Sequence, residues 1–98
     1  MAKYVLSTAA QASLRDISAR SIESFGVNRT KVYLNHMRDR MQALAINPLL
    51  GKARDELKLG FYSSYVGSHT IYYRIQPNQI EIIDVLHQAM EPSKHIDS

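Results

Sequence analysis

The sequence predicts an α+β fold of two layers, in which an N-terminal strand and a helical hairpin pack on a C-terminal three-stranded antiparallel meander. Three observations support this fold class. Apolar residues recur at intervals of three and four over residues 8–45, which is the period of an α-helix. From Phe61 the period changes to two, which is typical of strands. The four glycines and three prolines stand where these elements should end.

The length and composition are those of one compact domain spanning residues 1–98. The chain has 98 residues, of which 45% are hydrophobic, and this suits a single core. The absence of cysteine excludes disulfide scaffolds, thiol catalysis and cysteine-ligated zinc. No apolar run approaches the roughly 18 residues of a membrane helix, and the first residues are too soon polar for a signal peptide. We therefore expect a cytoplasmic protein with no membrane partner.

The N-terminal half predicts a strand and two helices. Residues 3–6 form a short apolar run, and Ser7 or Thr8 can cap the helix that follows, from about residue 8 to residue 25. Gly26 suits the left-handed conformation that ends a helix. A second helix ends before Pro48, because the residue before proline avoids helical angles. Its apolar stripe consists of Leu34, Met37, Met41 and Leu44. Only a few residues around Gly26 separate the two predicted helices, and so short a connection predicts a helical hairpin.

The C-terminal half predicts a loop, three strands and a tail. Residues 48–60 are expected to form the loop. The strands span residues 61–66, 69–76 and 79–86, and they are joined by tight turns at Gly67-Ser68 and Pro77-Asn78. The last of them is nearly all apolar, which predicts a central strand covered on both faces. The end of the chain, from about residue 90 to residue 98, is expected to be a mobile tail.

The sequence contains no recognisable metal-binding or phosphate-binding motif, and it offers one set of candidate catalytic residues. The four histidines lack metal-ligand spacing, so we expect no metal site, and the scattered glycines predict no phosphate loop and no cofactor. One catalytic function is still open, namely metal-free cleavage of RNA, which needs a general base, a general acid and a cation. The candidate residues for these roles are His69, Arg74 and His87. Residues 59–73, however, contain no lysine or arginine, and such a strand pair is a poor platform for RNA.

The positive charge gathers on the predicted helices. The net charge is +3, and Arg15, Arg20, Arg29, Lys31, Arg38 and Arg40 lie on the hairpin. Two interpretations are open: a solvated helix face, or a surface that binds an acidic protein or DNA. A DNA-binding module has only these cations in its favour, and we expect no direct sequence-specific binding of nucleic acid.

A series of motifs runs along nearly the whole chain. The most specific are His-Thr-Ile-Tyr-Tyr-Arg at residues 69–74 and Ile-Glu-Ile-Ile-Asp-Val-Leu-His at residues 80–87. Phe25-Gly26, Asn47-Pro48 and Arg54-Asp55-Glu56-Leu57 precede them, and Met90 and Lys94-His95-Ile96 follow. In this order and spacing, the motifs resemble those of the ParE toxins of bacterial type II toxin–antitoxin systems, within the RelE/ParE superfamily.

The resemblance implies a RelE/ParE-like fold and a toxin without catalytic residues. Such a toxin inhibits DNA gyrase by binding, so that replication stops, and a cognate ParD-like antitoxin neutralises it. The alternative within the superfamily is a RelE-like, ribosome-dependent mRNA endonuclease, for which His69, Arg74 and His87 are the candidate residues. The strand pair without cations favours the ParE branch.

Two sets of contacts follow. An acidic, amphipathic antitoxin segment is expected to contact the helical stripe, with its carboxylates pairing to arginine: the residues are Leu14, Ile17, Tyr33, Met37, Arg38, Arg40 and Met41. The alternative is that these apolar residues pack on the sheet. For the target, the resemblance implies contacts from the tail, at Met90, Lys94 and His95. Phe61 and Tyr62, which stand where many relatives have arginine, complete the candidate target surface.

Overall fold

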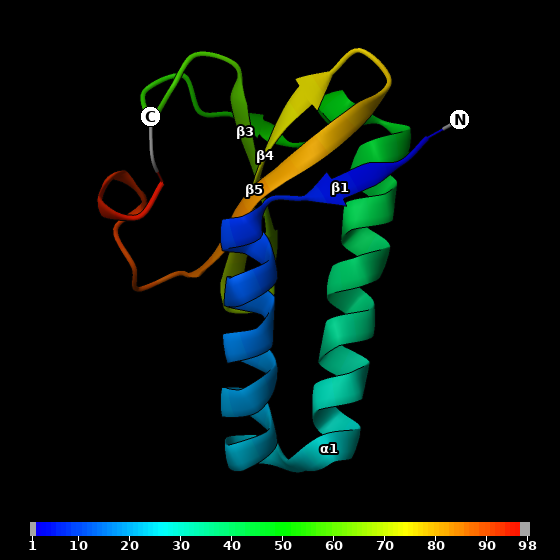
Figure 1. Ribbon diagram of the computed structural model, residues 1–98, viewed down its shortest axis with the longest axis vertical. Coiled ribbons are helices and arrows are strands. Elements are labelled where there is room, and N and C mark those ends of the chain that lie inside the picture. The colour runs from blue at the N-terminus through cyan, green and yellow to red at the C-terminus, as the bar shows by residue number, and fades with distance from the viewer. Residues whose placement is uncertain (1, 97–98) are drawn as a thin grey trace.

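A computed structural model of the chain describes residues 2–96 and confirms the two-layer α+β fold (Figure 1). The elements are β1 (Tyr4–Leu6), α1 (Thr8–Ile46), β2 (Lys52–Ala53), β3 (Phe61–Val66), β4 (His69–Gln76) and β5 (Gln79–His87), with short 3₁₀ turns at Pro48–Leu50 and Pro92–Lys94. No helix of the described residues is both long and apolar enough to cross a membrane.

The predicted hairpin is formed by α1, which Gly26 divides into two arms. Gly26 has φ 85° and ψ 173°, so the helix breaks there into a first arm (residues 8–25) and a second arm (residues 27–46). Ser7 caps the first arm, because its Oγ accepts a hydrogen bond from the amide of Ala10 at 3.0 Å. The same Oγ donates to the carbonyl of Ile83 at 2.6 Å, which fixes the start of the helix to β5.

The sheet has five strands in the order β1-β5-β4-β3-β2, of which the sequence predicts the N-terminal strand and the three-stranded meander but not β2. β1 lies parallel to β5, with Tyr4 opposite Ile80, and the other pairs are antiparallel. β2 lies inside the segment that the sequence predicts to be a loop. That prediction is wrong for Lys52 and Ala53 because a two-residue strand is too short to show an alternating pattern.

The main core lies between the hairpin and one face of the sheet. The sheet contributes Ile71, Tyr73, Ile80, Ile82 and Val85, and the arms contribute Ala10, Ile17, Met37, Met41, Leu44 and Ala45. The pairing of β4 with β5 skips Ile83, so that Val85 returns to the same face as Ile82. As a result, β5 buries apolar residues on both faces, as its sequence predicts.

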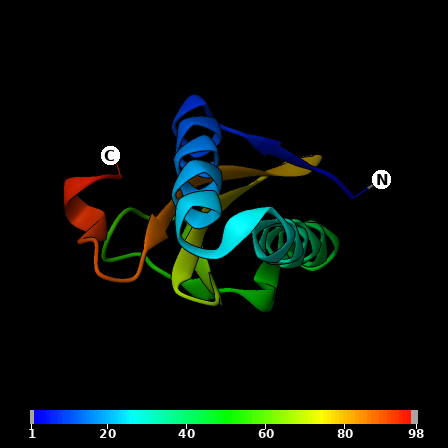
Figure 2. The same ribbon diagram turned by 90° about the horizontal axis from the view of Figure 1, so that it is seen from below.

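The other face of the sheet carries a smaller apolar cluster that includes the end of the chain. Ile96 is 9% exposed and packs with Phe61, Tyr72 and Leu86. The C-terminal turn lies on the opposite side of the molecule from the second arm (Figures 1 and 2). The segment expected to be a mobile tail is therefore packed as far as Ile96, since one apolar side chain anchors it. The predicted tail also includes residues 97 and 98, which lie outside the described residues.

Candidate functional site

A groove runs between the free end of the hairpin and the end of the sheet. Both arms extend beyond the sheet at the Gly26 end (Figure 1). Beneath them lie two adjoining hollows of about 550 Å³ each, which share Ser21, Phe25, Ser68 and His69. We call these two hollows together the hairpin groove. Its walls come from both arms of α1, the turn between β3 and β4, and the end of β5.

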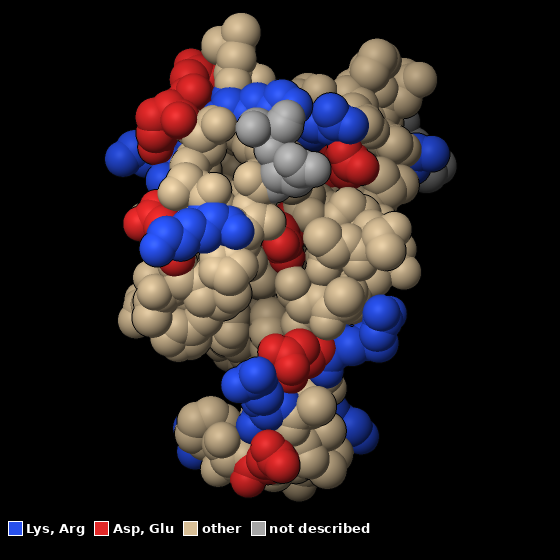
Figure 3. Space-filling model, turned by 60° about the vertical axis from the view of Figure 1, so that its left-hand side comes forward, with Lys and Arg blue, Asp and Glu red and all other residues tan. Residues whose placement is uncertain are grey.

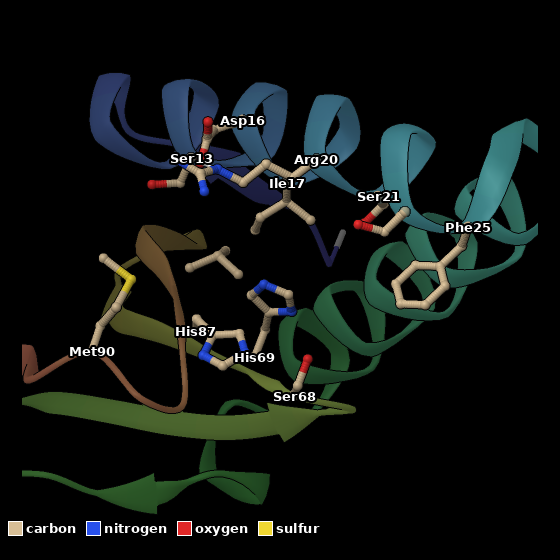
Figure 4. Close-up of a pocket in the computed structure, with 12 residues that line it drawn as sticks. Ser13, Asp16, Ile17, Arg20, Ser21, Phe25, Ser68, His69, His87 and Met90 are labelled. Atoms are coloured by element: carbon tan, nitrogen blue, oxygen red, sulfur yellow. Dashed lines mark hydrogen bonds and ion pairs between the residues drawn. The ribbon is translucent and has the colours of Figure 1, made fainter.

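Two histidines form the sheet side of the groove (Figure 4). His69 begins β4 and His87 ends β5, and the antiparallel register places them directly opposite each other. Their rings meet edge to face with centroids 5.4 Å apart. Eighteen positions of sequence separate them, and only the pairing of the strands brings them together.

Tyr33 of the second arm links this pair to the turn between β3 and β4. Its hydroxyl donates to the carbonyl of Val66 at 2.8 Å and lies 2.7 Å from Nδ1 of His69. Gly67 is required below the Tyr33 ring, because a Cβ there would lie 2.6 Å from a ring carbon, and its φ is 56°. The turn is thereby tied to the hairpin.

These hydrogen bonds fix the proton positions of the neutral imidazoles. Since the single Tyr33 proton goes to Val66, Nδ1 of His69 is the donor to Tyr33, and its Nε2 is left as an acceptor. Nδ1 of His87 accepts from the amide of Ala89 at 3.1 Å, so its Nε2 carries the proton. One imidazole therefore offers an acceptor and the other offers a donor.

Burial of the imidazole is the main reason that the pKa of His69 lies below its usual value of 6.5. The neighbouring His87 lowers this pKa further, because two protonated imidazoles so close together repel each other. His69 is consequently neutral at pH 7, which agrees with its role as a hydrogen-bonding partner of Tyr33.

The helical side of the groove combines polar residues with exposed apolar ones. Phe25 and Val32, which line the groove, are 57% and 56% exposed, and Ile22 and Val27, which lie next to it in sequence but not in its lining, are 42% and 51% exposed. The guanidinium of Arg29 lies 4.8 Å from the centre of the Phe25 ring. Four large apolar residues within eleven positions thus meet solvent at the free end of the hairpin, which is characteristic of a binding surface.

A hydrogen bond to the buried Asp84 positions the first arm over β5. Asp84 is 6% exposed, and its Oδ1 accepts from Oγ of Ser13 at 2.5 Å and from the amide of Val85 at 2.8 Å. One turn further along, Arg20 pairs with Asp16 at 2.8 Å, but both side chains are more than half exposed, so this pair contributes little to stability.

The hairpin carries the whole excess of positive charge. Residues 8–46 contain six lysines and arginines against three acidic residues, whereas the rest of the chain has six of each. Figure 3 shows basic and acidic side chains next to one another at the free end of the hairpin and at the opposite end of the molecule, with larger areas of uncharged residues between these ends. A net positive charge on the arms favours association with an oppositely charged partner.

The structure does not bring the three candidate nuclease residues together. Arg74 lies five positions along β4 from His69, which is about 16 Å, and on the opposite face of the strand. Its guanidinium donates to Glu81 at 2.6 Å. Among the residues that the structure describes, no three histidine, aspartate or glutamate side chains are grouped so that they could hold a metal ion.

The residues predicted to contact an antitoxin divide into two groups. Ile17, Met37 and Met41 are 8%, 1% and 2% exposed, because the arms turn this stripe onto the sheet. For these three the alternative interpretation, packing on the sheet, describes the structure. The half-buried Leu14 and Tyr33 and the exposed Arg38 and Arg40 keep surface for a partner. Arg40 also donates to Oγ of Ser64 at 2.9 Å.

The predicted target residues also differ in exposure. Phe61 is 5% exposed and belongs to the smaller apolar cluster, so it presents almost no surface. Tyr62 is half-buried and stacks on Tyr73 with ring centroids 5.6 Å apart. Lys94 and His95 are exposed, and Met90 is 38% exposed at the edge of the hairpin groove.

Sequence reasoning missed the hairpin groove itself. The sequence indicates His69 and His87 as nuclease candidates and as parts of two motifs, and Phe25 as part of the Phe25-Gly26 motif, but it does not show that they share one groove. One signal was present: Ile22, Phe25, Val27 and Val32 are apolar, lie near Gly26 and exceed what one core-facing stripe needs. A surplus of apolar residues at the end of a hairpin indicates a face that the sheet does not cover.

Comparison with known proteins identifies relatives along most of the chain. A family model described as the ParE toxin of the type II toxin–antitoxin system parDE matches residues 4–92. Toxin ParE1 of Mycobacterium tuberculosis is 35% identical over 95 residues, which covers 96% of this chain and 97% of that protein. Toxin ParE1 of Caulobacter vibrioides is 33% identical over 96 residues, which covers 98% of this chain and 99% of that protein.

Two solved structures have a similar fold. A chain from the chromosomal ParDE system of P. aeruginosa superposes with a TM-score of 0.76 at 15% identity, covering 89% of this chain and 96% of that one. A chain of the toxin–antitoxin complex RelBE2 from M. tuberculosis superposes with a TM-score of 0.60 at 23% identity, covering 88% of this chain and 96% of that chain.

Proposed function

Because the chain belongs to the ParE toxins of type II toxin–antitoxin systems, we propose that it inhibits DNA gyrase by binding in the cytoplasm, which blocks replication, and that a cognate ParD-like antitoxin neutralises it. The observation that carries this proposal is the match of the family model to residues 4–92, which include nearly every element of the fold.

Inhibition by binding is supported by the placement of the polar residues. Metal-free RNA cleavage needs a base, an acid and a cation around one phosphate. His69 and His87 lie together, but Arg74 points away from them and is held by Glu81. A protein that acts by occupying a target needs no such convergence, and it needs exposed surface instead, which the hairpin and the tail provide.

An antitoxin partner is supported by the structural relatives, two of which come from toxin–antitoxin systems. The positively charged hairpin suits a partner of opposite charge. For the target, we propose contacts from Lys94, His95, Met90 and the open side of Tyr62, since Phe61 is buried.

The direct test is the supercoiling of relaxed plasmid DNA by purified gyrase. We expect increasing amounts of this protein to stop supercoiling, and the protein encoded by the adjacent reading frame to restore it. Lys94→Glu should weaken inhibition several-fold by removing a tail cation, whereas the matched change Lys3→Glu, at the other terminus, should leave it unchanged.

Normal supercoiling at saturating toxin would contradict the proposal. Mapping of mRNA after induction then decides for the endonuclease, because fresh cuts within codons are the product of that reaction.

A further inference from the structure

We propose that the hydrogen bond from the amide of Ala89 to the ring of His87 is a pH-sensitive switch for the first turn of the C-terminal segment, residues 88–96. The neutral imidazole holds the turn, and protonation of the imidazole releases it. The switch does not depend on which target the protein binds, since it follows from hydrogen bonds inside the chain.

The three backbone amides of the turn that follows β5 are each hydrogen-bonded. The amide of Gln88 donates to the carbonyl of Ser68 at 2.8 Å, and the amide of Met90 donates to the carbonyl of His87 at 2.8 Å. The amide of Ala89 donates to Nδ1 of His87 at 3.1 Å. Only this last bond has a titratable acceptor, so it is the one that acid can break directly.

Protonation of His87 turns this acceptor into a donor. In the neutral ring the lone pair of Nδ1 faces the amide, and Nε2 carries the proton. A second proton can therefore go only to Nδ1, towards which the N–H of Ala89 already points. Two donors cannot bond to each other, so either the ring turns or the amide moves away, and both movements open the turn.

The neighbouring His69 responds to acid differently. Burial, and then the nearby His87, lowers the pKa of His69 below its usual value of 6.5. Nδ1 of His69 already donates to Tyr33, so a proton added at Nε2 would leave that hydrogen bond in place. The exposed ring of His87 is therefore the one at which a proton changes the hydrogen bonding.

The charged side chains around His87 are already engaged. From the first arm, Asp16 and Arg20 line the same hollow and form an ion pair at 2.8 Å (Figure 4). Asp84, earlier on β5, is hydrogen-bonded to the same arm. From β4, the ring of His69 faces His87 and repels a second positive charge. A proton on His87 thus gains no free counter-ion from these groups to offset the lost bond.

The switch acts on the direction in which the C-terminal segment leaves the sheet. Met90, uncharged and 38% exposed, follows the switch directly and lines the same hollow as His87. Further along, the amide of Ile96 bonds the carbonyl of Pro92 at 2.9 Å, and the Ile96 side chain packs on the sheet. Release of the turn therefore lets Met90 move while Ile96 stays packed.

The proposal is tested first on the unaltered protein, by NMR over the pH range in which the His87 ring titrates. We expect the amide signal of Ala89 to shift with the same midpoint as the carbon-bound protons of His87. The hydrogen-exchange protection of this amide, relative to its intrinsic rate at each pH, should fall about 2–10-fold on protonation. The amide of Ile96 should keep its protection. An Ala89 amide that stays unchanged while His87 titrates would overturn the proposal.

A second test uses variants. In His87→Asn, the side-chain oxygen can accept from the amide two residues on but does not titrate, so Ala89 should be insensitive to pH. His69→Gln leaves the bond to His87 intact and should keep the response of the wild-type protein, as should the matched control His95→Gln at an exposed residue of the same segment. A response that persists in His87→Asn, or disappears in His69→Gln, would assign the titration to another group and overturn the switch.

Discussion

At the scale of single residues, the environment of a side chain decides its role more than its type does. Tyr33 bonds Val66 and His69 and thus joins three segments that are distant in sequence. Gly51 shows a similar dependence, because Oη of Tyr73 accepts from its amide at 3.0 Å and donates to the carbonyl of Pro48 at 2.6 Å. A Cβ at Gly51 would collide with that hydroxyl, so the loop needs glycine for close approach.

His69 makes the stability of the protein depend on pH. Burial, and then His87, lowers the pKa of His69 below 6.5, so the unfolded chain takes up a proton at a pH where the folded chain does not. The free energy of unfolding should therefore decrease as the pH falls from 7.5 through about 6.5 and towards the lowered pKa of the folded state.

His69→Gln should make this decrease smaller, as measured by urea denaturation at several pH values. His95→Gln, at an exposed residue, is the matched control and should keep the slope of the wild-type protein. Equal slopes for His69→Gln and the wild type would show that His69 does not carry the effect.

At the scale of elements, the hairpin is defined by one residue. Gly26 combines φ 85° with ψ 173°, a backbone conformation that is open almost only to glycine. Nothing lies within 4 Å of the place where a Cβ would stand, so the requirement at Gly26 is conformational, in contrast to the close contact at Gly51. The direction of the second arm, and with it the width of the hairpin groove, follows from this residue.

Gly26→Ala should lower the free energy of unfolding by about 1–3 kcal/mol, because the backbone must be strained or the arms must shift. Chemical denaturation measures this loss, with Ser24→Ala as the control at an exposed helical position of the same arm. A loss below about 0.5 kcal/mol would mean that alanine is accommodated by another connection of the arms.

At the scale of the whole molecule, charge and exposure differ between the hairpin and the sheet. The hairpin holds the net positive charge, and the sheet is covered on one face by the arms and on part of the other by Leu57 and Ile96. Among the described residues, exposed surface for partners includes the free end of the hairpin and the exposed residues of the tail. Met90 lies between these two surfaces, at the edge of the hairpin groove.

This charge distribution predicts a salt-dependent association with an acidic antitoxin. Raising the NaCl concentration from about 0.05 to 0.5 M should slow association at least ~10-fold, while dissociation changes much less, because salt screens the attraction between separated charges. Stopped-flow mixing measures both rates. Lys31→Glu on the hairpin should reduce the salt dependence, and Lys52→Glu should not. An association rate independent of salt would exclude electrostatic attraction to the hairpin.

Much of the fold is predictable from the sequence because its signals are local. The periods of the apolar residues, the Ser7 cap, Gly26 and the turn at Gly67-Ser68 are each set by neighbours in the chain. The strand β2 and the pairing partner of β1 were not predictable in the same way, although the sequence predicts the strand β1 itself. Lys52 and Ala53 are too few to show a period, and the parallel pairing of β1 depends on residues about 75 positions away.

The sequence by itself determined the fold class, the hairpin, the boundaries of the main strands and the resemblance to ParE toxins. Only the tertiary structure decided that Met37 is buried while Phe25 is open, that His69 faces His87 without Arg74, and that Ile96 is packed. The physical reason is that helical and strand periods are properties of neighbouring residues, whereas burial and convergence depend on what distant segments place opposite each side chain.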